Sequence, residues 1–384
     1  MRVLFVNQFY LPDAAATGQL LGDLTEGFAG ARVVCGAGGY ASNRGGAGSG
    51  SVEVVRLGGM GFGHGVVRKL GSYLAFYFRA LGVVLLGPRA DVVVTMTTPP
   101  GLGVLGWAAQ GWRGSRHVIW EMDVYPDVAE ELGTFRKGGW MARLSGGVMD
   151  AARRRADAVV VLGRCMAERM AGRGVAWSRI HVCENWADGR LVEVAPFHDE
   201  PELRVLYSGN LGLAHDVVTL AGALARLAGG FRVLVSGGGP RRGWLERACA
   251  GMEWVSFRGY EERERLGALL AWGDVGLVTQ RAETVGTVVP SKAYGVMAAG
   301  RGVVYVGPAE SEVGRMVEEM GVGWRVSNGD VAGLAALLER LRGDRAEVKR
   351  VGAQARRVFE ERYERGVGVS RVKGVIEQCI RLYS

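Results

Sequence analysis

The chain has 384 residues, of which 48% are hydrophobic and 22% are charged, so it can form about two globular domains and is not a disordered chain. Its formal net charge of +8 favours anionic partners such as nucleotide phosphates or an anionic membrane surface, although a merely solvated basic surface would give the same value. The five cysteines show no CxxC spacing and the five histidines no HxxxH or HxH pair, which argues against a disulfide framework and against any metal site.

The first half of the chain alternates short β-branched segments with longer helical ones. This alternation predicts a parallel sheet covered by helices on both faces. The chain opens directly with a strand and lacks the layout of a signal peptide, so we expect a cytoplasmic protein. Strands are predicted at 2–7, 31–35, 52–57, 91–96, 116–121, 158–162 and 179–183, and helices at 17–29, 66–86, 101–112, 138–155 and 165–172.

Residues 70–87 are the most apolar stretch of the chain. Arg79 interrupts it, and Lys69 and Arg89 flank it, so it falls short of the roughly 20 apolar residues that cross a bilayer. We therefore expect a buried or interfacial helix here. The glycine-rich segment 36–50 has no periodicity and is predicted to be a loop, either without a role or acting as a flap over the acceptor.

A polar break over 184–202 precedes a second series of alternating segments. The sequence therefore predicts an α/β protein with two doubly wound parallel-sheet domains, residues 1–190 and 200–365. Strands are predicted at 203–208, 231–235, 253–258, 274–278, 302–306 and 323–326, and helices at 215–228, 242–250, 261–271, 291–299, 310–320, 331–341, 344–362 and 366–382.

Polar residues follow two strands of the first half at their carboxyl ends, where open α/β sheets bind ligands. After the first strand come Thr17, Gly18 and Gln19; Thr17 would cap the next helix or contact a ligand, and Gly18 would let a phosphate or sugar approach that helix. Asp123 and Asp127 follow the strand at 116–121. Carboxylates there suit catalysis or the binding of substrate hydroxyls, and helix capping is the alternative.

Glycine turns follow two strands of the second half. Such turns allow backbone amides to face an anion, so we predict that the second domain holds a nucleotide. Neither turn reads GxGxxG, which argues against a nicotinamide dehydrogenase. The dispersed arginines argue against nucleic-acid binding, which needs a localised basic face. The candidate donor-binding residues are Gly209, Asn210 and Gly212 in one turn and Gly237, Gly238 and Gly239 in the other.

Lys292 is the most specific candidate, because only five of the 47 basic residues are lysines. Pro290 and Ser291 predict a helix start, which places Lys292 in the first turn, where the helix dipole disfavours a cation. A bound diphosphate would remove this conflict; a side chain directed into solvent is the alternative.

Several segments together resemble glycosyltransferase family 4, in particular the transferases of bacterial surface-polysaccharide assembly. They occur in the family's order and cover most of the chain. The segments are Asn7-Gln8-Phe9-Tyr10, Pro12 to Leu21, Thr98-Pro99-Pro100, Asp123-Val124-Tyr125-Pro126-Asp127, Ser208-Gly209-Asn210-Leu211-Gly212, Pro290-Ser291-Lys292-Ala293-Tyr294, Met297 to Arg301, Glu310-Ser311-Glu312 and Asn328-Gly329-Asp330.

The resemblance implies a GT-B fold, with two Rossmann-like domains facing a cleft and the last helix, 366–384, packing back on the first domain. It implies a retaining transferase that needs no metal or other cofactor and uses a UDP- or GDP-sugar as donor. It also implies a saccharide or polyprenyl-linked acceptor at the inner face of the cell membrane, with peripheral contact to anionic lipid through the segment 66–87.

The same resemblance implies roles for individual residues. Asp123 and Asp127 would be catalytic, with Asp123 orienting the acceptor, and Thr17, Gly18 and Gln19 would lie on the acceptor side. Lys292 would also be catalytic and would bind the diphosphate, with Arg301 and Arg281 as further candidates. Ser291 and Tyr294 would line the donor site, and Glu310 or Glu312 would bind donor hydroxyls.

The sequence also departs from the family pattern. Thr287 and Gly295 stand where the family carries two glutamates, and Asn210 and His215 stand where it carries a basic pair. These departures keep two alternatives open, a sugar-nucleotide epimerase on the same fold and a non-catalytic partner protein.

Overall fold

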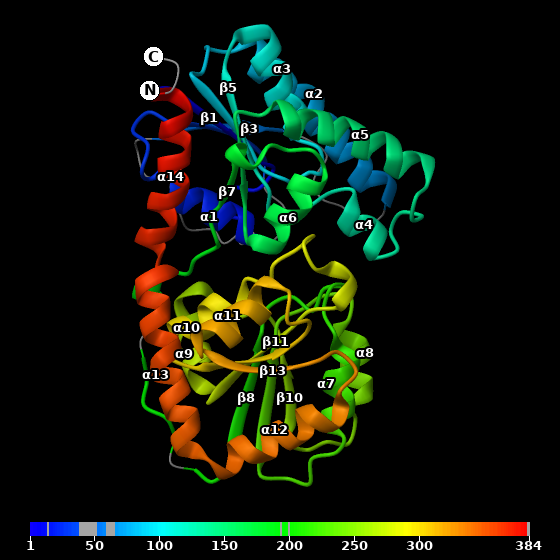
Figure 1. Cartoon of the computed structure of the whole chain (residues 1–384), viewed down its shortest axis with the longest axis vertical. Helices are drawn as coiled ribbons and strands as arrows, with labels where there is room; N and C mark the ends of the chain where they lie inside the picture. The colour runs from blue at the N-terminus through cyan, green and yellow to red at the C-terminus, as the bar shows by residue number, and fades with distance from the viewer. Residues whose placement is uncertain (14, 38–51, 59–65, 193, 199, 382–384) are drawn as a thin grey trace. The chain divides into compact units, whose positions relative to one another are not determined.

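The computed structural model describes residues 1–13, 15–37, 52–58, 66–192, 194–198 and 200–381. The chain divides into two compact units: unit 1 is Met1–Glu184 with Gly368–Ser384, and unit 2 is Asn185–Val367. Each unit contains one parallel sheet with helices around it (Figure 1). Most of the glycine-rich segment predicted as a flap lies outside the described residues.

The sheet of unit 1 has seven strands in the order β3-β2-β1-β4-β5-β6-β7. Because β1 pairs in parallel with both β2 and β4, the strand order reverses at β1, and the turns after β1 and β4 meet at the switch point of the sheet. The strands are β1 Val3–Val6, β2 Arg32–Gly36, β3 Glu53–Leu57, β4 Val92–Thr95, β5 Arg116–Trp120, β6 Ala158–Val161 and β7 Ile180–Val182. The helices are α1 Ala16–Thr25, α2 Val66–Leu86, α3 Gly103–Arg113, α4 Asp127–Glu131, α5 Trp140–Arg155 and α6 Arg164–Gly172, with a short 3-10 helix at Trp177–Arg179.

The apolar stretch of the sequence forms α2, and the structure explains its composition by burial. Phe76, Ala80 and Val84 of α2 pack in a core cluster with Leu105 and Ala109 of α3. Within the described ranges of the chain, no helix is long and apolar enough to cross a membrane.

The last helix, α14 (Arg365–Arg381), begins in unit 2 and belongs to unit 1 from Gly368 onward. In unit 1, Arg371 Nη1 lies 2.8 Å from Glu184 Oε2, and Lys373 Nζ lies 5.6 Å from the centroid of the Phe28 ring. The C-terminal segment therefore completes the first unit although it follows the second unit in sequence.

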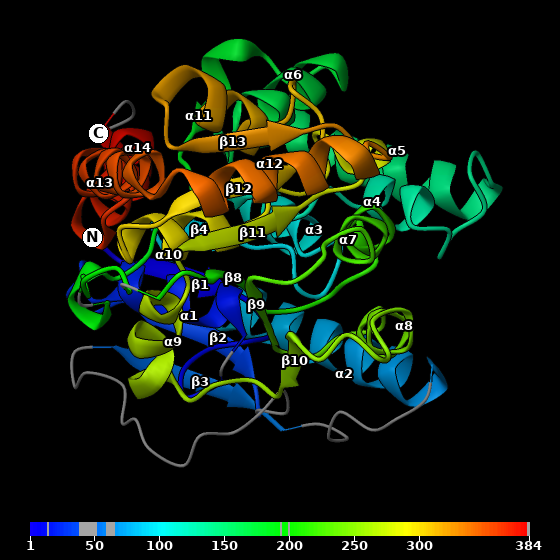
Figure 2. The same ribbon diagram turned by 90° about the horizontal axis from the view of Figure 1, so that it is seen from below.

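The sheet of unit 2 has six strands in the order β10-β9-β8-β11-β12-β13. Its central strands are buried along their length, as expected for a sheet with helices on both faces, and α7 and α12 pack on each other beside it (Figure 2). The strands are β8 Leu203–Ser208, β9 Phe231–Ser236, β10 Val255–Arg258, β11 Val275–Thr279, β12 Gly302–Val306 and β13 Gly323–Val326. The helices are α7 Val217–Leu224, α8 Arg242–Ala248, α9 Leu266–Trp272, α10 Lys292–Ala298, α11 Glu312–Met320, α12 Val331–Gly343 and α13 Arg345–Arg362, with short 3-10 helices at Gly189–Leu191, Arg263–Arg265 and Ala282–Thr284.

The prediction of two doubly wound parallel sheets is confirmed. The sequence analysis missed the short helix α4, because its five residues are too few to show a helical period.

Candidate active site

The two glycine turns of unit 2 pack directly against each other, because β8 and β9 are neighbours. Leu211 N donates to Gly238 O at 2.7 Å. Gly209, Gly237 and Gly239 have φ angles of 119°, 133° and 122°, and a Cβ on Gly237 would lie 2.1 Å from Gly209 O. Glycine is strongly favoured at such positions, so the paired turns form a floor of backbone without side chains, on which an anion can rest.

Lys292 lies beside this floor. It is the first residue of α10, and a Cβ on Gly209 would lie 3.0 Å from Lys292 Cε. Its Nζ atom is 5.4 Å from the centroid of the Tyr207 ring, and burial lowers the pKa of Lys292 from 10.5 to about 8. Ser291 takes the N-cap position as predicted, is exposed, and makes no capping hydrogen bond through its side chain.

His215 holds the Lys292 ammonium by a hydrogen bond. His215 Nδ1 is 2.7 Å from Thr279 O, and since a carbonyl oxygen can only accept, Nδ1 carries the proton. The lone pair of Nε2 therefore faces Lys292 Nζ at 3.0 Å, and the ammonium donates to it. Burial and the Lys292 charge lower the pKa of His215 to about 3, so the ring stays neutral. The residue at a position where the family has a base is here a hydrogen-bond acceptor.

The remaining donor-site candidates of unit 2 divide into two groups. Asn210 and Gly212 continue the first glycine turn, and Asn210 O accepts from Tyr207 Oη at 3.2 Å. Glu310 and Glu312 follow β12 at the carboxyl edge of the same sheet, at the start of α11. Glu310 is exposed and Glu312 is buried.

Arg301 and Tyr294 do not lie where the sequence analysis predicted. Arg301 is fully buried: its Nε donates to Gly273 O at 2.6 Å and its Nη2 to Ala271 O at 2.9 Å and to Ala195 O at 3.0 Å. These bonds attach the segment at Ala195 to the rest of unit 2. A guanidinium that is buried and bonded to these carbonyls does not face a bound nucleotide-sugar. Tyr294 is also fully buried and packs on the ring of Tyr363 at 5.1 Å. Both predictions are corrected to structural roles.

Sequence reasoning missed Gln280, which follows β11 at the carboxyl edge of the sheet. Gln280 Nε2 donates to Thr284 O and Val288 O, both at 3.2 Å, and so shapes the loop that leads to Lys292. Thr287, at one of the two missing glutamates, is buried in this loop and donates to Thr284 O at 2.8 Å. The other position, Gly295, lies within α10. The position of Gln280 at a strand end was the signal that could have identified it.

In unit 1, Asp123 lies in the turn between β5 and α4. Its backbone N donates to Thr97 Oγ1 at 3.3 Å, but its half-buried carboxylate makes no hydrogen bond or ion pair within the described part of the chain. Burial raises the pKa of Asp123 from 3.8 to about 6, and the neighbouring charge of Glu121 adds to the effect. A carboxyl with this pKa can bind a hydroxyl near neutral pH either as acceptor or as donor.

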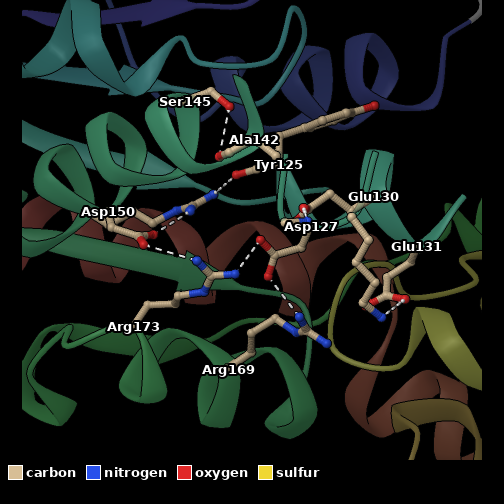
Figure 3. A network of polar contacts seen from close by, with 12 residues as sticks. Tyr125, Asp127, Glu130, Glu131, Ala142, Ser145, Asp150, Arg169 and Arg173 are labelled. Carbon is tan, nitrogen blue, oxygen red and sulfur yellow. Dashed lines mark hydrogen bonds and ion pairs between the residues drawn. The ribbon is translucent and has the colours of Figure 1, made fainter. Parts of the chain in front are cut away.

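The turn that carries Asp123 is held by one continuous chain of ion pairs, which contains three carboxylates and three guanidinium groups. Figure 3 shows the part of this chain from Asp150 to Arg169. Arg153 Nη2 also donates to Tyr125 O at 2.9 Å, which ties the network to the turn itself. In order, the pairs are Glu121–Arg153 at 2.7 Å, Arg153–Asp150 at 3.0 Å, Asp150–Arg173 at 3.2 Å, Arg173–Asp127 at 2.5 Å and Asp127–Arg169 at 2.8 Å.

Asp127, predicted to be catalytic, is corrected by this network. Its carboxylate is 2% exposed and is neutralised by Arg169 and Arg173, so it fixes the turn instead of facing a substrate. Figure 3 shows both guanidinium groups directed at Asp127, that of Arg173 from the left and that of Arg169 from below.

The acceptor-side residues after β1 lie in the first turn of α1. Thr17 is inside the helix and does not cap it; Asp13 Oδ1 accepts from Ala15 N at 2.9 Å instead. Gly18 is buried, and a Cβ there would lie 3.2 Å from Phe9 C, so close packing against the preceding turn requires the glycine. Thr17 and its neighbour Gln19 are half-buried.

Two protein families match the chain, one in each unit. A glycosyl transferase 4-like domain matches residues 14–186, and the domain described as glycosyl transferases group 1 matches residues 202–344. The two matches together follow the division of the structure into units 1 and 2.

Two curated proteins are similar in sequence. The glycosyltransferase named WbjE of Pseudomonas aeruginosa is 26% identical over 308 residues, which cover 76% of this chain and 75% of that protein. The colanic acid biosynthesis glycosyl transferase named WcaI of Escherichia coli K12 is 29% identical over 245 residues, which cover 59% of each chain.

Solved structures share the fold. Sucrose-phosphate synthase from Thermosynechococcus elongatus has a TM-score of 0.79 at 17% identity and full coverage of both chains. HepE from Anabaena, solved in complex with UDP and glucose, has a TM-score of 0.74 at 16% identity over 98% of this chain and 100% of its own.

Proposed function

Because the chain belongs to the GT-B glycosyltransferases of the surface-polysaccharide type, we propose that it transfers a sugar from a UDP- or GDP-sugar with retention of anomeric configuration. The acceptor is a saccharide or a polyprenyl-linked saccharide at the inner face of the cell membrane. The reaction uses no metal and no cofactor beyond the nucleotide-sugar itself.

One observation carries the donor half of this proposal: the Lys292 ammonium lies against the Gly209 turn and is held there by His215. Backbone amides and one cation are what a diphosphate requires, and they stabilise the charge that develops on the leaving nucleotide. HepE, which has the same fold, was solved in complex with UDP-glucose, and this supports a nucleotide-sugar as the donor.

The acceptor half rests on Asp123, whose carboxylate has no protein partner among the described residues. In the proposed reaction Asp123 orients the acceptor hydroxyl. The hydroxyl oxygen bonds to the anomeric carbon on the face that the diphosphate leaves, the bond to the phosphate oxygen breaks, and that phosphate oxygen takes the hydroxyl proton. Retention follows from attack on the departing face.

The test is a panel of UDP- and GDP-sugars with a polyprenyl-diphosphate-linked saccharide, with and without EDTA. We expect one donor to give a product whose anomeric proton coupling matches that of the donor, at an unchanged rate in EDTA. An inverted linkage would contradict retention, and loss of activity in EDTA would contradict the metal-free reaction. Conversion of the donor without any acceptor would instead indicate an epimerase.

A further inference from the structure

The outer face of α5 exposes a row of large apolar side chains. Trp140 is 74% exposed, Met141 52%, Leu144 63% and Val148 39%. Trp140, Leu144 and Val148 are spaced four residues apart and Met141 adjoins them, so all four lie in one stripe along the helix. We call these four residues the α5 stripe. Contiguous apolar surface of this kind marks an interaction site in a folded protein.

The opposite face of α5 shows that the exposure is not an effect of poor packing. The residues that α5 buries against unit 1 include the small residues Ala142, Gly146 and Ala152 as well as Met149. Small residues thus face the protein while three of the four largest apolar residues face outward, the reverse of an ordinary amphipathic helix. Burial within this chain does not explain the composition of the α5 stripe.

The charge around the α5 stripe has one sign. From Leu132 to Met149 the sequence contains the exposed bases Arg136, Lys137 and Arg143 and no acidic residue. Lys137 pairs with Glu131, just outside this segment, through an ion pair of 3.2 Å in which Lys137 is largely exposed. An aromatic and aliphatic stripe flanked by bases is typical of helices that lie in the interface of an anionic bilayer.

We propose that the α5 stripe docks this protein onto the surface of an anionic lipid bilayer, with Arg136 and Arg143 at the level of the lipid head groups. The inference rests on the proposed function, because a polyprenyl-linked acceptor has to be reached at a membrane. Charge complementarity favours an anionic bilayer: the exposed bases have no exposed acid among them, and they flank the exposed apolar residues of one helix.

The α5 stripe differs from the surface that the sequence favoured. In α2 the core explains Phe76, Ala80 and Val84, although Leu74, Phe78 and Leu86 remain exposed. The two helices therefore both provide exposed apolar residues, but in α5 three of the four largest apolar residues face outward, whereas α2 places several of its own in the core.

The test is co-sedimentation of the full chain with vesicles of phosphatidylglycerol and phosphatidylcholine, compared with pure phosphatidylcholine. Trp140→Ser and Leu144→Ser should each weaken binding to the anionic vesicles by about tenfold or more, because each removes a large apolar side chain from the interface. Arg143→Gln should weaken it by about fivefold. The matched control variants Leu74→Ser and Phe78→Ser on α2 should leave binding within about twofold, within the ordinary spread of such measurements.

A second measurement uses the cysteines, all five of which are buried. Leu144→Cys should therefore take a polarity-sensitive fluorophore selectively, and its emission should shift to the blue when anionic vesicles are added. An unchanged emission, binding equal to that of phosphatidylcholine alone, or loss of binding only in the α2 variants would each overturn the inference. If the unaltered chain self-associates, a Trp140→Ser variant that is monomeric but binds vesicles normally would also overturn the inference, because the α5 stripe would then be a protein interface.

Calorimetry with UDP on the same variants separates this inference from the proposed function. The α5 variants should bind UDP as the unaltered chain does, because the glycine turns belong to unit 2. A chain that docks on vesicles through α5 but binds no nucleotide would refute the proposed donor and leave the docking inference supported.

Discussion

The candidate residues of units 1 and 2 are held in place by different means. In unit 1 a chain of arginines and carboxylates holds the turn that carries Asp123, whereas in unit 2 bare glycine backbone forms the floor beside Lys292. In both units burial favours the uncharged form of the candidate residue: it raises the pKa of Asp123 to about 6 and lowers that of Lys292 to about 8. Two units of similar architecture thus supply a weak acid, Asp123, and a weak base, Lys292.

The comparison predicts first that unit 1 depends on its ion pairs for stability. Arg153→Ala should lower the free energy of unfolding by about 3–5 kcal/mol, because it leaves the fully buried Glu121 carboxylate without its partner. Urea denaturation measures this, with the exposed neighbour Arg154→Ala as control. A loss below about 1 kcal/mol, the usual value for surface ion pairs, would mean that the network does not hold the turn.

In unit 2, Lys292 should contribute to catalysis and not to stability. Lys292→Ala should lower the transfer rate by about 10²–10³-fold, the cost of removing one group that stabilises developing charge. Steady-state kinetics with a UDP-sugar measure this, and Lys349→Ala on the exposed face of α13 is the control. Unchanged kinetics would remove Lys292 from the mechanism.

Asp123 should show a trade between stability and activity. Asp123→Asn should lower the rate by about 10²-fold and raise the free energy of unfolding at pH 7 by about 1–3 kcal/mol. The raised pKa means that the folded state binds the proton more tightly, so the carboxylate costs nothing below pH 4 and its full cost appears above pH 6. Denaturation of both proteins at pH 3.5 and pH 7 measures the difference in their free energies of unfolding. The same difference at both pH values would contradict the prediction.

The smallest predicted effect concerns pH and sharpens the role of Lys292. UDP affinity should fall toward tenfold per pH unit above pH 8, because the free enzyme then loses the ammonium. Lys292→Arg should bind with an affinity independent of pH between 7 and 9, since a guanidinium does not titrate there. Calorimetry at pH 7, 8 and 9 compares the two proteins. A parallel fall in both would assign the titration to another group.

The fold and the donor half could be read from the sequence because parallel strands end at one edge. The Gly209 and Gly237 turns and Lys292 each follow a strand of the same sheet, so their meeting was predictable from strand order alone. The contact between His215 and Lys292 was not, because it joins residues 77 positions apart and depends on side-chain direction.

The choice between similar residues also needed coordinates. Asp123 and Asp127 are carboxylates in one turn, and only the position of α6, which brings Arg169, shows which of them is paired. The sequence did not reveal that Arg301 is buried. Its burial depends on the carbonyl of Ala195, which lies in a segment with no regular pattern. The sequence could indicate which edge of each sheet carries the candidate residues. It could not indicate which polar groups at that edge are already hydrogen-bonded or ion-paired within the protein.

An amine that loses its proton near pH 8 is also a nucleophile. The pKa of Lys292 is lowered to about 8, so at mildly alkaline pH its neutral amine presents a lone pair to small electrophiles. The burial that lowers the pKa of Lys292 therefore also makes this lysine a site for selective chemical labelling. A reagent that acylates amines at pH 8 should mark this lysine first, and a bound nucleotide should shield it.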